Sequence, residues 1–171
     1  QLKGKKAKRR NPSEMIFISG VQNAVALDAE RSLIRIGERL NVRGSKKARE
    51  AVETDTGIDM DVLEEVAREQ ITDLGCEIID VCMDSNHVNT VQTLSKVIHQ
   101  ISSEIKGAIC IDSFQPDALI EAVHYYAGIP ILNSISLEEV EPGKSKLDVL
   151  IPLTKDFGCF YVALCTDSKG P

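Results

Sequence analysis

Five short apolar runs recur along the chain, and this repeat restricts the possible folds more than any other feature. The runs cover residues 33–37, 77–83, 108–112, 129–135 and 159–165. Their near-continuous apolar character is typical of strands that are covered on both faces. Successive runs lie about thirty residues apart, the length of one strand-helix-strand unit. The pattern therefore predicts an α/β fold with five parallel strands.

Helical start and stop signals frame the stretches between these runs. Asp59 precedes the first amphipathic stretch, and either Asn89 or Thr90 is expected to cap the second. A third helix is expected to begin at Pro116, because proline is favoured in the first helical turn. In the fourth stretch, Pro152 removes a backbone donor and must bend or split the helix.

Two architectures fit this order, a doubly wound sheet and a (β/α)8 TIM barrel. No run is followed by the GxGxxG pattern that typifies dinucleotide-binding sheets. A complete barrel needs about 250 residues, so the 171 residues present are expected to supply about the first five strands. We assign 1–32 to a basic tail or linker from a preceding domain and 33–171 to the N-terminal part of the barrel.

Composition excludes several classes of function. The net charge is −6, which argues against attraction of the whole chain to nucleic acid or anionic membranes, although six basic residues crowd the first ten positions. No apolar stretch has the length of a membrane span. The five cysteines form no CxxC pair and adjoin apolar runs, a pattern that favours reduced thiols in a cytoplasmic protein and predicts no metal site.

Polar side chains lie where the predicted strands end. Asp80 is inside the second run, Asp112 ends the third, and Asn133 lies in the fourth. Side chains alternate across a strand, so these three groups converge at the C-terminal mouth of a barrel if their faces point inward. The alternative is that Asp112 and Asn133 belong to helix caps or turns. That role does not explain Asp80, because a buried carboxylate is costly unless it is satisfied.

Two carboxylates and an amide at the base of an apolar cup suit a particular kind of ligand. Adjacent N–H donors on a heterocycle match the two oxygens of a carboxylate, as a guanidinium does. An asparagine side chain offers a donor and an acceptor together, which suits a lactam edge. A pterin has both edges.

Four segments carry a resemblance to a known family. Residues 36–47 (IGERLNVRGSKK), 75–84 (GCEIIDVCMD), 109–113 (ICIDS) and 131–139 (ILNSISLEE) resemble, in order and spacing, the pterin-binding domain of cobalamin-dependent methionine synthases. More distantly, the segments are similar to methyltetrahydrofolate:corrinoid protein methyltransferases and to dihydropteroate synthases. The resemblance covers residue 33 to the end and implies a TIM barrel.

The resemblance also implies a reaction and a set of binding residues. The substrate would be 5-methyltetrahydrofolate, and its methyl group would pass to cobalamin on another domain or on a corrinoid protein. Asp112 and Asn133 would hydrogen-bond the pterin ring, with Asp80 at its edge. The other residues that match the family motifs and would lie at or near the ring are Glu38, Asn41, Gly44, Ser45 and Lys46.

The sequence leaves alternatives open. One is a dihydropteroate synthase-like enzyme, which would require a different first loop and a glycine-rich second motif. The other is a truncated pterin-binding module without turnover, because an opened barrel exposes a strand edge that must pair with the missing half or another chain. We expect the segment alone to be inactive. Cys82 departs from the family pattern, where asparagine is expected.

Overall fold

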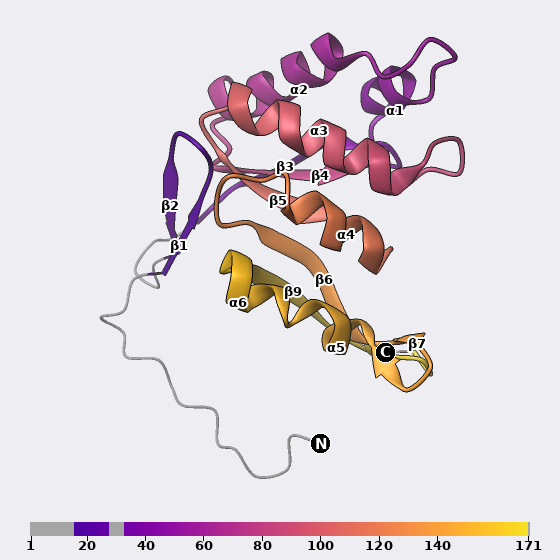
Figure 1. The fold of residues 1–171 in the computed structure, drawn as a ribbon. Helices are drawn as coiled ribbons and strands as arrows, with labels where there is room; N and C mark the ends of the chain where they lie inside the picture. The colour runs from indigo at the N-terminus through magenta and orange to yellow at the C-terminus, as the bar shows by residue number, and fades with distance from the viewer. Residues whose placement is uncertain (1–15, 28–32, 171) are drawn as a thin grey trace.

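Five parallel strands form the central sheet of the protein. The computed structural model describes residues 16–27 and 33–170. The strands pair in chain order, each with the next (Figure 1). A doubly wound sheet reverses its strand order, whereas a barrel does not. The sheet is therefore the segment of a (β/α)8 barrel that the sequence predicts. Its strands are β3 (Ile36–Asn41), β4 (Ile78–Cys82), β5 (Ala108–Asp112), β6 (Ile131–Leu137) and β9 (Phe160–Asp167).

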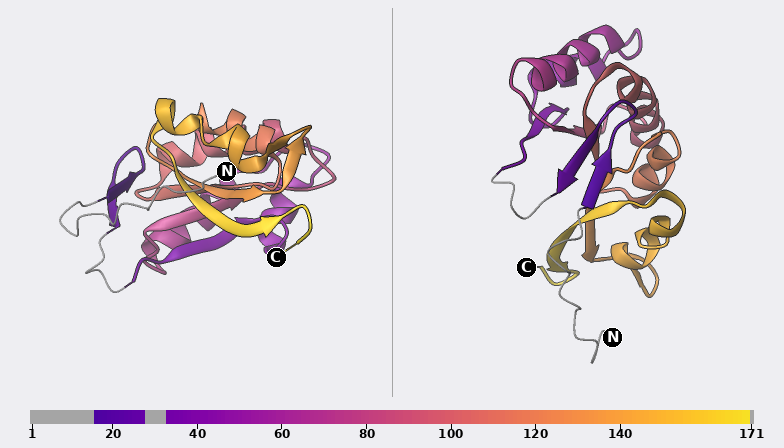
Figure 2. Two further views of the ribbon diagram at one scale, coloured as in Figure 1. Left: turned by 90° about the horizontal axis from the view of Figure 1, so that it is seen from below. Right: turned by 90° about the vertical axis from the view of Figure 1, so that its left-hand side faces the viewer.

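The helices pack on the outer, convex side of this curved sheet (Figure 2). Alternate strand residues such as Ile79, Ile109 and Leu132 are completely buried against helix residues such as Leu63 and Leu94. This outer layer is the main hydrophobic core. The helices are α1 (Lys46–Val52), α2 (Met60–Thr72), α3 (Thr90–Glu104), α4 (Pro116–Val123), α5 (Lys146–Leu150) and α6 (Leu153–Phe157).

The helix boundaries follow the local signals in the sequence. The Asp59 and Asn89 side chains cap α2 and α3 by accepting from the backbone N–H groups three residues later. Pro116 is the first residue of α4, as predicted. Pro152 separates α5 from α6, which ends at Gly158 in a left-handed conformation (φ 66°). The predicted split of the fourth helix is therefore confirmed.

Three details differ from the sequence-based expectation. The first strand runs from Ile36 to Asn41 rather than over 33–37, and its register with β4 shifts between Gly37 and Leu40. An edge strand tolerates polar residues because one side remains accessible to solvent. The short helix α1 is not among the helices that the sequence predicts. A second hairpin, β7 (Glu139–Glu141) with β8 (Lys144–Ser145), lies between β6 and α5.

An N-terminal hairpin closes the bottom of the barrel interior. Strands β1 (Ile16–Ser19) and β2 (Ala24–Leu27) pair antiparallel, and Ile18 and Val25 pack against Ile78 and Ala108 at the start of β4 and β5. The hairpin falls within the segment that we assigned to the linker, whose basic residues 3–10 lie outside the described part of the chain.

Backbone and side-chain hydrogen bonds hold this hairpin in place. Ser19 exchanges two backbone hydrogen bonds of 3.0 Å with Ile129, two residues before β6. The Tyr126 hydroxyl donates to the Ser19 carbonyl at 2.8 Å and accepts from the Ile109 N–H at 3.0 Å. A Cβ at Gly128 would lie 2.2 Å from the Ser19 carbonyl oxygen. Glycine therefore permits the close approach of the two backbones.

Candidate functional site

The inward-facing side chains of the sheet change from apolar to polar along the strands. Ile78 and Ala108 form the lowest layer, next to the hairpin. One layer higher, Asp80 pairs with Cys110. The polar groups lie toward the C-terminal ends of the strands, where ligands bind in parallel barrels.

The uppermost layer is a row of side chains across four neighbouring strands. Asn41 pairs with Cys82, Cys82 with Asp112, and Asp112 with Asn133. Three of these four positions are predicted site residues, and the fourth is the cysteine that departs from the family pattern. The row therefore brings polar side chains of four neighbouring strands side by side at the mouth of the barrel interior.

Asp80 lies beneath this row and is only 4% exposed. Burial raises the pKa of its carboxyl to about 6, and the negative charges of Asp112 and Glu38 add to the rise. Hydrogen bonding to Cys110 and Asn133 opposes it. Near neutral pH, Asp80 is consequently a largely ionised acceptor that is protonated under mildly acidic conditions.

Asp112 also has a raised pKa, chiefly because of burial. The Cys82 thiol lowers it through a hydrogen bond, and the charge of Lys146 lowers it further, whereas Asp84 and Glu38 raise it. Burial raises the pKa of the Cys82 thiol itself. Cys82 is therefore a neutral donor to Asp112, which partly replaces the amide expected at this position.

A buried network supports the row from the outer side. The Asp84 carboxylate accepts from the Ser113 hydroxyl at 2.7 Å and from the Phe114 N–H at 2.9 Å. Lys146, 4% exposed, donates from Nζ to the Ser113 carbonyl at 2.8 Å. Burial lowers the pKa of Lys146, and the charges of Asp112, Asp84 and Glu138 oppose that effect. The network fixes the turn that follows Asp112.

The remaining predicted residues lie around the loop after β3. The Asn41 side-chain oxygen accepts from the Arg43 and Gly44 N–H groups, which shapes the turn. The Ser45 hydroxyl caps α1 by accepting from the Ala48 N–H at 3.3 Å. Glu38, Asn41, Gly44, Ser45 and Lys46 line a common hollow beside the row.

The structure thus divides the predicted residues into two adjoining groups. Asp80, Asp112 and Asn133 share the barrel interior, and Glu38 lies near enough for its charge to act on both aspartates. Lys46 is different, because its side chain is 78% exposed and lies 3.5 Å from Glu50 on the same helix. Its side chain is therefore directed largely to solvent.

Asp112 and Asn133 do not cap any of the described helices, which was the alternative role considered for them. Gln115 and Ser145 occupy the N-cap positions of α4 and α5, and only Ser145 makes a side-chain capping bond. Ser113 accepts from the Gln115 N–H at 3.0 Å, so it does shape a turn. Asp112 and Asn133 are therefore oriented by the strands rather than by helix capping.

Sequence reasoning did not select Lys146 or the Arg43–Phe114 pair. The Arg43 guanidinium carbon lies 4.9 Å from the centroid of the Phe114 ring, and its Nε donates to the Asp84 carbonyl at 3.4 Å. In the sequence, Lys146 precedes an apolar helical stripe and looks like a surface lysine. Only the proximity of separate loops reveals these residues, although the position of Phe114 just after a strand end is a weak signal.

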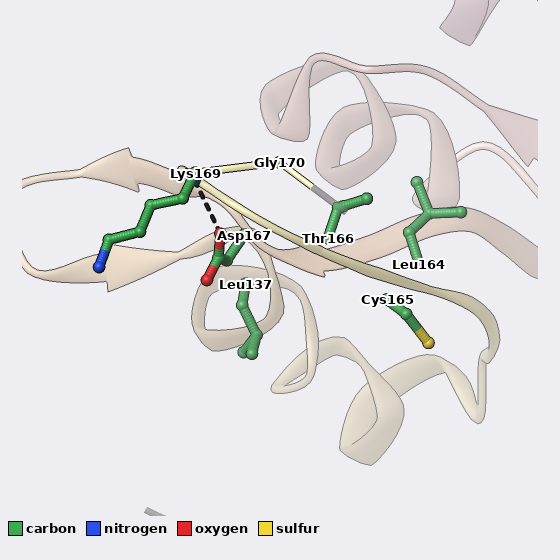
Figure 3. Close-up of a pocket in the computed structure, with 7 residues that line it drawn as sticks. All are labelled: Leu137, Leu164, Cys165, Thr166, Asp167, Lys169 and Gly170. Carbon is green, nitrogen blue, oxygen red and sulfur yellow. Dashed lines mark hydrogen bonds between the residues drawn. The ribbon is translucent and has the colours of Figure 1, made fainter.

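A further hollow lies at the C-terminal ends of β6 and β9 (Figure 3). Leu137 and Leu164 there are 62% and 46% exposed. The Lys169 N–H donates to Asp167 at 2.7 Å in the turn after β9. None of the predicted site residues lines this hollow. Its lining residues are Leu137, Leu164, Cys165, Thr166, Asp167, Lys169 and Gly170.

Over 16–27 and 33–170, no group of three or more His, Cys, Asp or Glu side chains is arranged to hold a metal ion. No helix in the same ranges is long and apolar enough to cross a membrane.

Comparisons with known proteins agree with this geometry. The methionine synthase of Mycobacterium tuberculosis is 26% identical over 153 residues, and that of Mycobacterium leprae has the same identity over the same length. Each match covers 90% of this chain but only 12% of the relative, so the chain spans about an eighth of those proteins' length. The family model described as "Pterin binding enzyme" matches residues 37–170, and the chain belongs to that family.

Proposed function

We propose that the chain binds the pterin ring of 5-methyltetrahydrofolate so that its methyl group can be transferred to cobalamin on another domain or protein. The observation that carries the proposal is the convergence of Asp80, Asp112 and Asn133 in the barrel interior. The similarity to methionine synthases supports the choice of reaction.

The donor set suits a pterin. The ionised carboxylate of Asp112 matches the adjacent N–H groups on the amidine-like edge of the ring. Asn133, its neighbour in the row, can donate to and accept from the lactam edge. Asp80 lies one layer below and would accept a further ring N–H. The buried thiols of Cys82 and Cys110 are the neighbours of Asp112 and Asp80 on the adjacent strands.

The role of these residues in the reaction is orientation and electrostatics. Cob(I)alamin, when bound on its own domain, supplies the nucleophile that accepts the methyl group. The chain would hold the pterin in the barrel mouth with its methyl-bearing nitrogen accessible. The raised pKa of Asp80 places a proton-exchanging group near the ring, within reach of mild changes in pH.

A spectroscopic assay tests the proposed reaction. The complete protein that contains this chain is mixed with 5-methyltetrahydrofolate and cob(I)alamin, and methylcobalamin formation is followed by absorbance. Methyl transfer is expected. Tight folate binding without methyl transfer would support the alternative of a binding module without turnover.

A parallel assay separates the dihydropteroate synthase-like alternative. Dihydropterin pyrophosphate and p-aminobenzoate replace folate and cobalamin, and pyrophosphate release is measured. We expect no release above the background rate. Release at a substantial rate, without methyl transfer in the first assay, would overturn the methyltransferase proposal.

We further propose that the outer edge of β9 is covered by additional barrel strands or by another chain. Within the described residues, β9 pairs only with β6 and β3 only with β4. Val162 and Leu164 on β9 are 38% and 46% exposed. Apolar residues on an unpaired edge favour pairing with a further strand. The hollow in Figure 3 is lined by the C-terminal part of β9 together with Leu137 of β6.

The cysteines support a proposal about the cellular compartment. All five are free thiols, and Cys82, Cys110 and Cys159 are buried. Free thiols are typical of a reducing environment, so we propose that the protein works in the cytoplasm.

A further inference from the structure

Strand β3 carries one more residue than the stretch of β4 with which it pairs. The register between the two strands shifts between Gly37 and Leu40. Glu38 and Arg39 of β3 therefore lie opposite the single residue Asp80 of β4. This arrangement of two residues against one is a β-bulge, which bends a strand and changes the direction of its side chains.

The bulge decides which side chains of β3 face the barrel interior. On a regular strand, residues three apart point to opposite faces of the sheet. Glu38 and Asn41 are three residues apart, yet both line the hollow beside the row. Leu40, between them, is fully buried in the outer core. The extra residue explains this combination, because it reverses the alternation of every residue that follows.

The side chain of Gln70, from α2, holds the bulge from the helix side. Its Oε1 accepts from the Arg39 N–H at 2.7 Å, and its Nε2 donates to the Val66 carbonyl at 3.2 Å. Gln70 is only 1% exposed. A bulge leaves one residue unpaired in the ladder, and a backbone N–H without a partner is costly away from water. Gln70 supplies that partner from outside the sheet.

Gly37 makes room for this glutamine. A Cβ at position 37 would lie 2.5 Å from the Oε1 atom of Gln70 and 3.2 Å from the Cys76 sulfur. Any larger residue would therefore push the glutamine away from the Arg39 N–H. The absence of a side chain at Gly37 and the length of the Gln70 side chain together allow the hydrogen bond that holds the bulge.

The position of Glu38 affects the charge of the site. Burial is the main cause of the raised pKa of Asp112, and the charges of Asp84 and Glu38 add to the rise. The hydrogen bond from Cys82 and the charge of Lys146 act in the opposite direction. If Glu38 moved away from the interior, the pKa of Asp112 would therefore fall toward its ordinary value.

We propose that Gln70 is a positioning residue for the pterin site, because it fixes the bulge that turns both Glu38 and Asn41 into the barrel interior. The inference rests on the proposed function and adds to it a residue from the helix layer. Gln70 lies on the helix side of the sheet, so its effect on a ligand must pass through these two residues.

Calorimetry of 5-methyltetrahydrofolate binding over a pH series, on the complete protein that contains this chain, tests the proposal. Gln70→Met keeps the length of the side chain but removes both hydrogen bonds. The bulge should then relax, and affinity at neutral pH should fall about fivefold, as for one lost hydrogen bond. The pH below which binding is lost should decrease, because Asp112 stays ionised to a lower pH when Glu38 is farther away.

A second substitution shows whether Gln70 acts through Glu38. Glu38→Gln removes the charge directly and should also lower the pH below which binding is lost. When Glu38→Gln is combined with Gln70→Met, this pH should not decrease further, because both changes act through one charge. Additive shifts in the double variant would overturn the inference.

Two more variants separate positioning from a general loss of stability. Gln70→Glu should restore affinity and pH profile, because a buried glutamic acid is neutral and can still accept from the Arg39 N–H and donate to the Val66 carbonyl. Gln100→Met is the matched control on α3, where Gln100 is exposed and donates to Glu64 at 2.9 Å. It should leave binding unchanged at every pH.

Urea denaturation of the same variants completes the test. Lower stability of Gln70→Met with an unchanged pH profile would overturn the inference, because Gln70 would then support the fold alone. If Gln70→Met does not fold, Gly37→Ala displaces the same side chain and takes its place. Failure of both variants to fold would also overturn it. If the unmodified protein does not bind 5-methyltetrahydrofolate, the proposed function itself fails, so the two failures are distinguishable.

Discussion

The floor and the mouth of the barrel interior are built from the same strands but have different roles. At the floor, Ile78 and Ala108 are fully buried against Ile18 of the N-terminal hairpin. The mouth lies farther along the same strands. There, Asp80 and Asp112 carry carboxylates whose pKa values are raised by burial. The floor gains stability from apolar burial, whereas the mouth keeps charges that cost stability and would be useful to a ligand.

The largest effect is expected from breaking the floor. Ile18→Ala removes a fully buried side chain and leaves a cavity between the hairpin and the sheet, which should lower the free energy of unfolding by about 3 kcal/mol. Urea denaturation measures the loss, and Val21→Ala, at a position that is 48% exposed, is the control. Folate affinity of the folded protein should not change. A loss of affinity without a loss of stability would contradict the division between floor and mouth.

The second largest effect is expected at the mouth, where a substitution should weaken folate binding without lowering stability. Asp112→Asn removes the charge that faces the pterin and should weaken 5-methyltetrahydrofolate binding about a hundredfold, as for a charge-assisted hydrogen bond. Calorimetry measures the affinity, and thermal denaturation should show equal or greater stability. Asp117→Asn, an exposed position in the first turn of α4, is the matched control. Unchanged affinity of Asp112→Asn would sink the assignment of the site.

The same contrast explains how far the sequence predicts the fold. Helix caps such as Asp59 and breakers such as Pro152 act within a few residues, so their effects could be predicted. The extent of β3 was missed because Glu38 and Arg39 look like loop residues. Gln70 accepts from the Arg39 N–H at 2.7 Å, and this contact depends on α2 rather than on the local sequence.

The candidate site shows the same limit. Asp80, Asp112 and Asn133 were predictable because strand alternation and the parallel order place strand ends together. Lys146 was not predictable, because its burial depends on the β7–β8 hairpin, which positions α5 beside the end of β5. Long-range contacts of this kind leave no periodic pattern in the chain.

A third prediction concerns the dependence of stability on pH. The pKa of Asp80 is about 6 in the folded protein and about 3.9 in an unfolded chain. Because the folded-state value is raised, the folded protein binds a proton first as the pH falls, so stability should rise between pH 7 and pH 4, on the order of 2 kcal/mol.

The variant Asp80→Asn tests that dependence. The stability of this variant should lack the rise between pH 7 and pH 4 that Asp80 causes. At pH 8 the variant should be at least as stable as the unmodified protein, because it no longer carries a buried charge. Urea denaturation at pH 4, 5, 6, 7 and 8, which we choose to span the window, measures the difference between the two proteins. The same pH slope in both would show that another group is responsible.

The smallest effect is expected in the buried network of Asp84, Ser113 and Lys146 beside the mouth. Lys146→Met keeps the side-chain length but removes the donor to the Ser113 carbonyl, at a cost of about 1 kcal/mol in stability. The pKa of Asp112 should rise because a nearby positive charge is lost. As the pH is lowered, Asp112 should then be protonated sooner, so folate binding should be lost at a higher pH than in the unmodified protein. Calorimetry across a pH series measures that shift. Lys144→Met, at an exposed position paired with Glu141 at 2.9 Å, is the matched control. A loss of stability with no shift in the pH profile would show that Lys146 supports the fold without tuning the mouth.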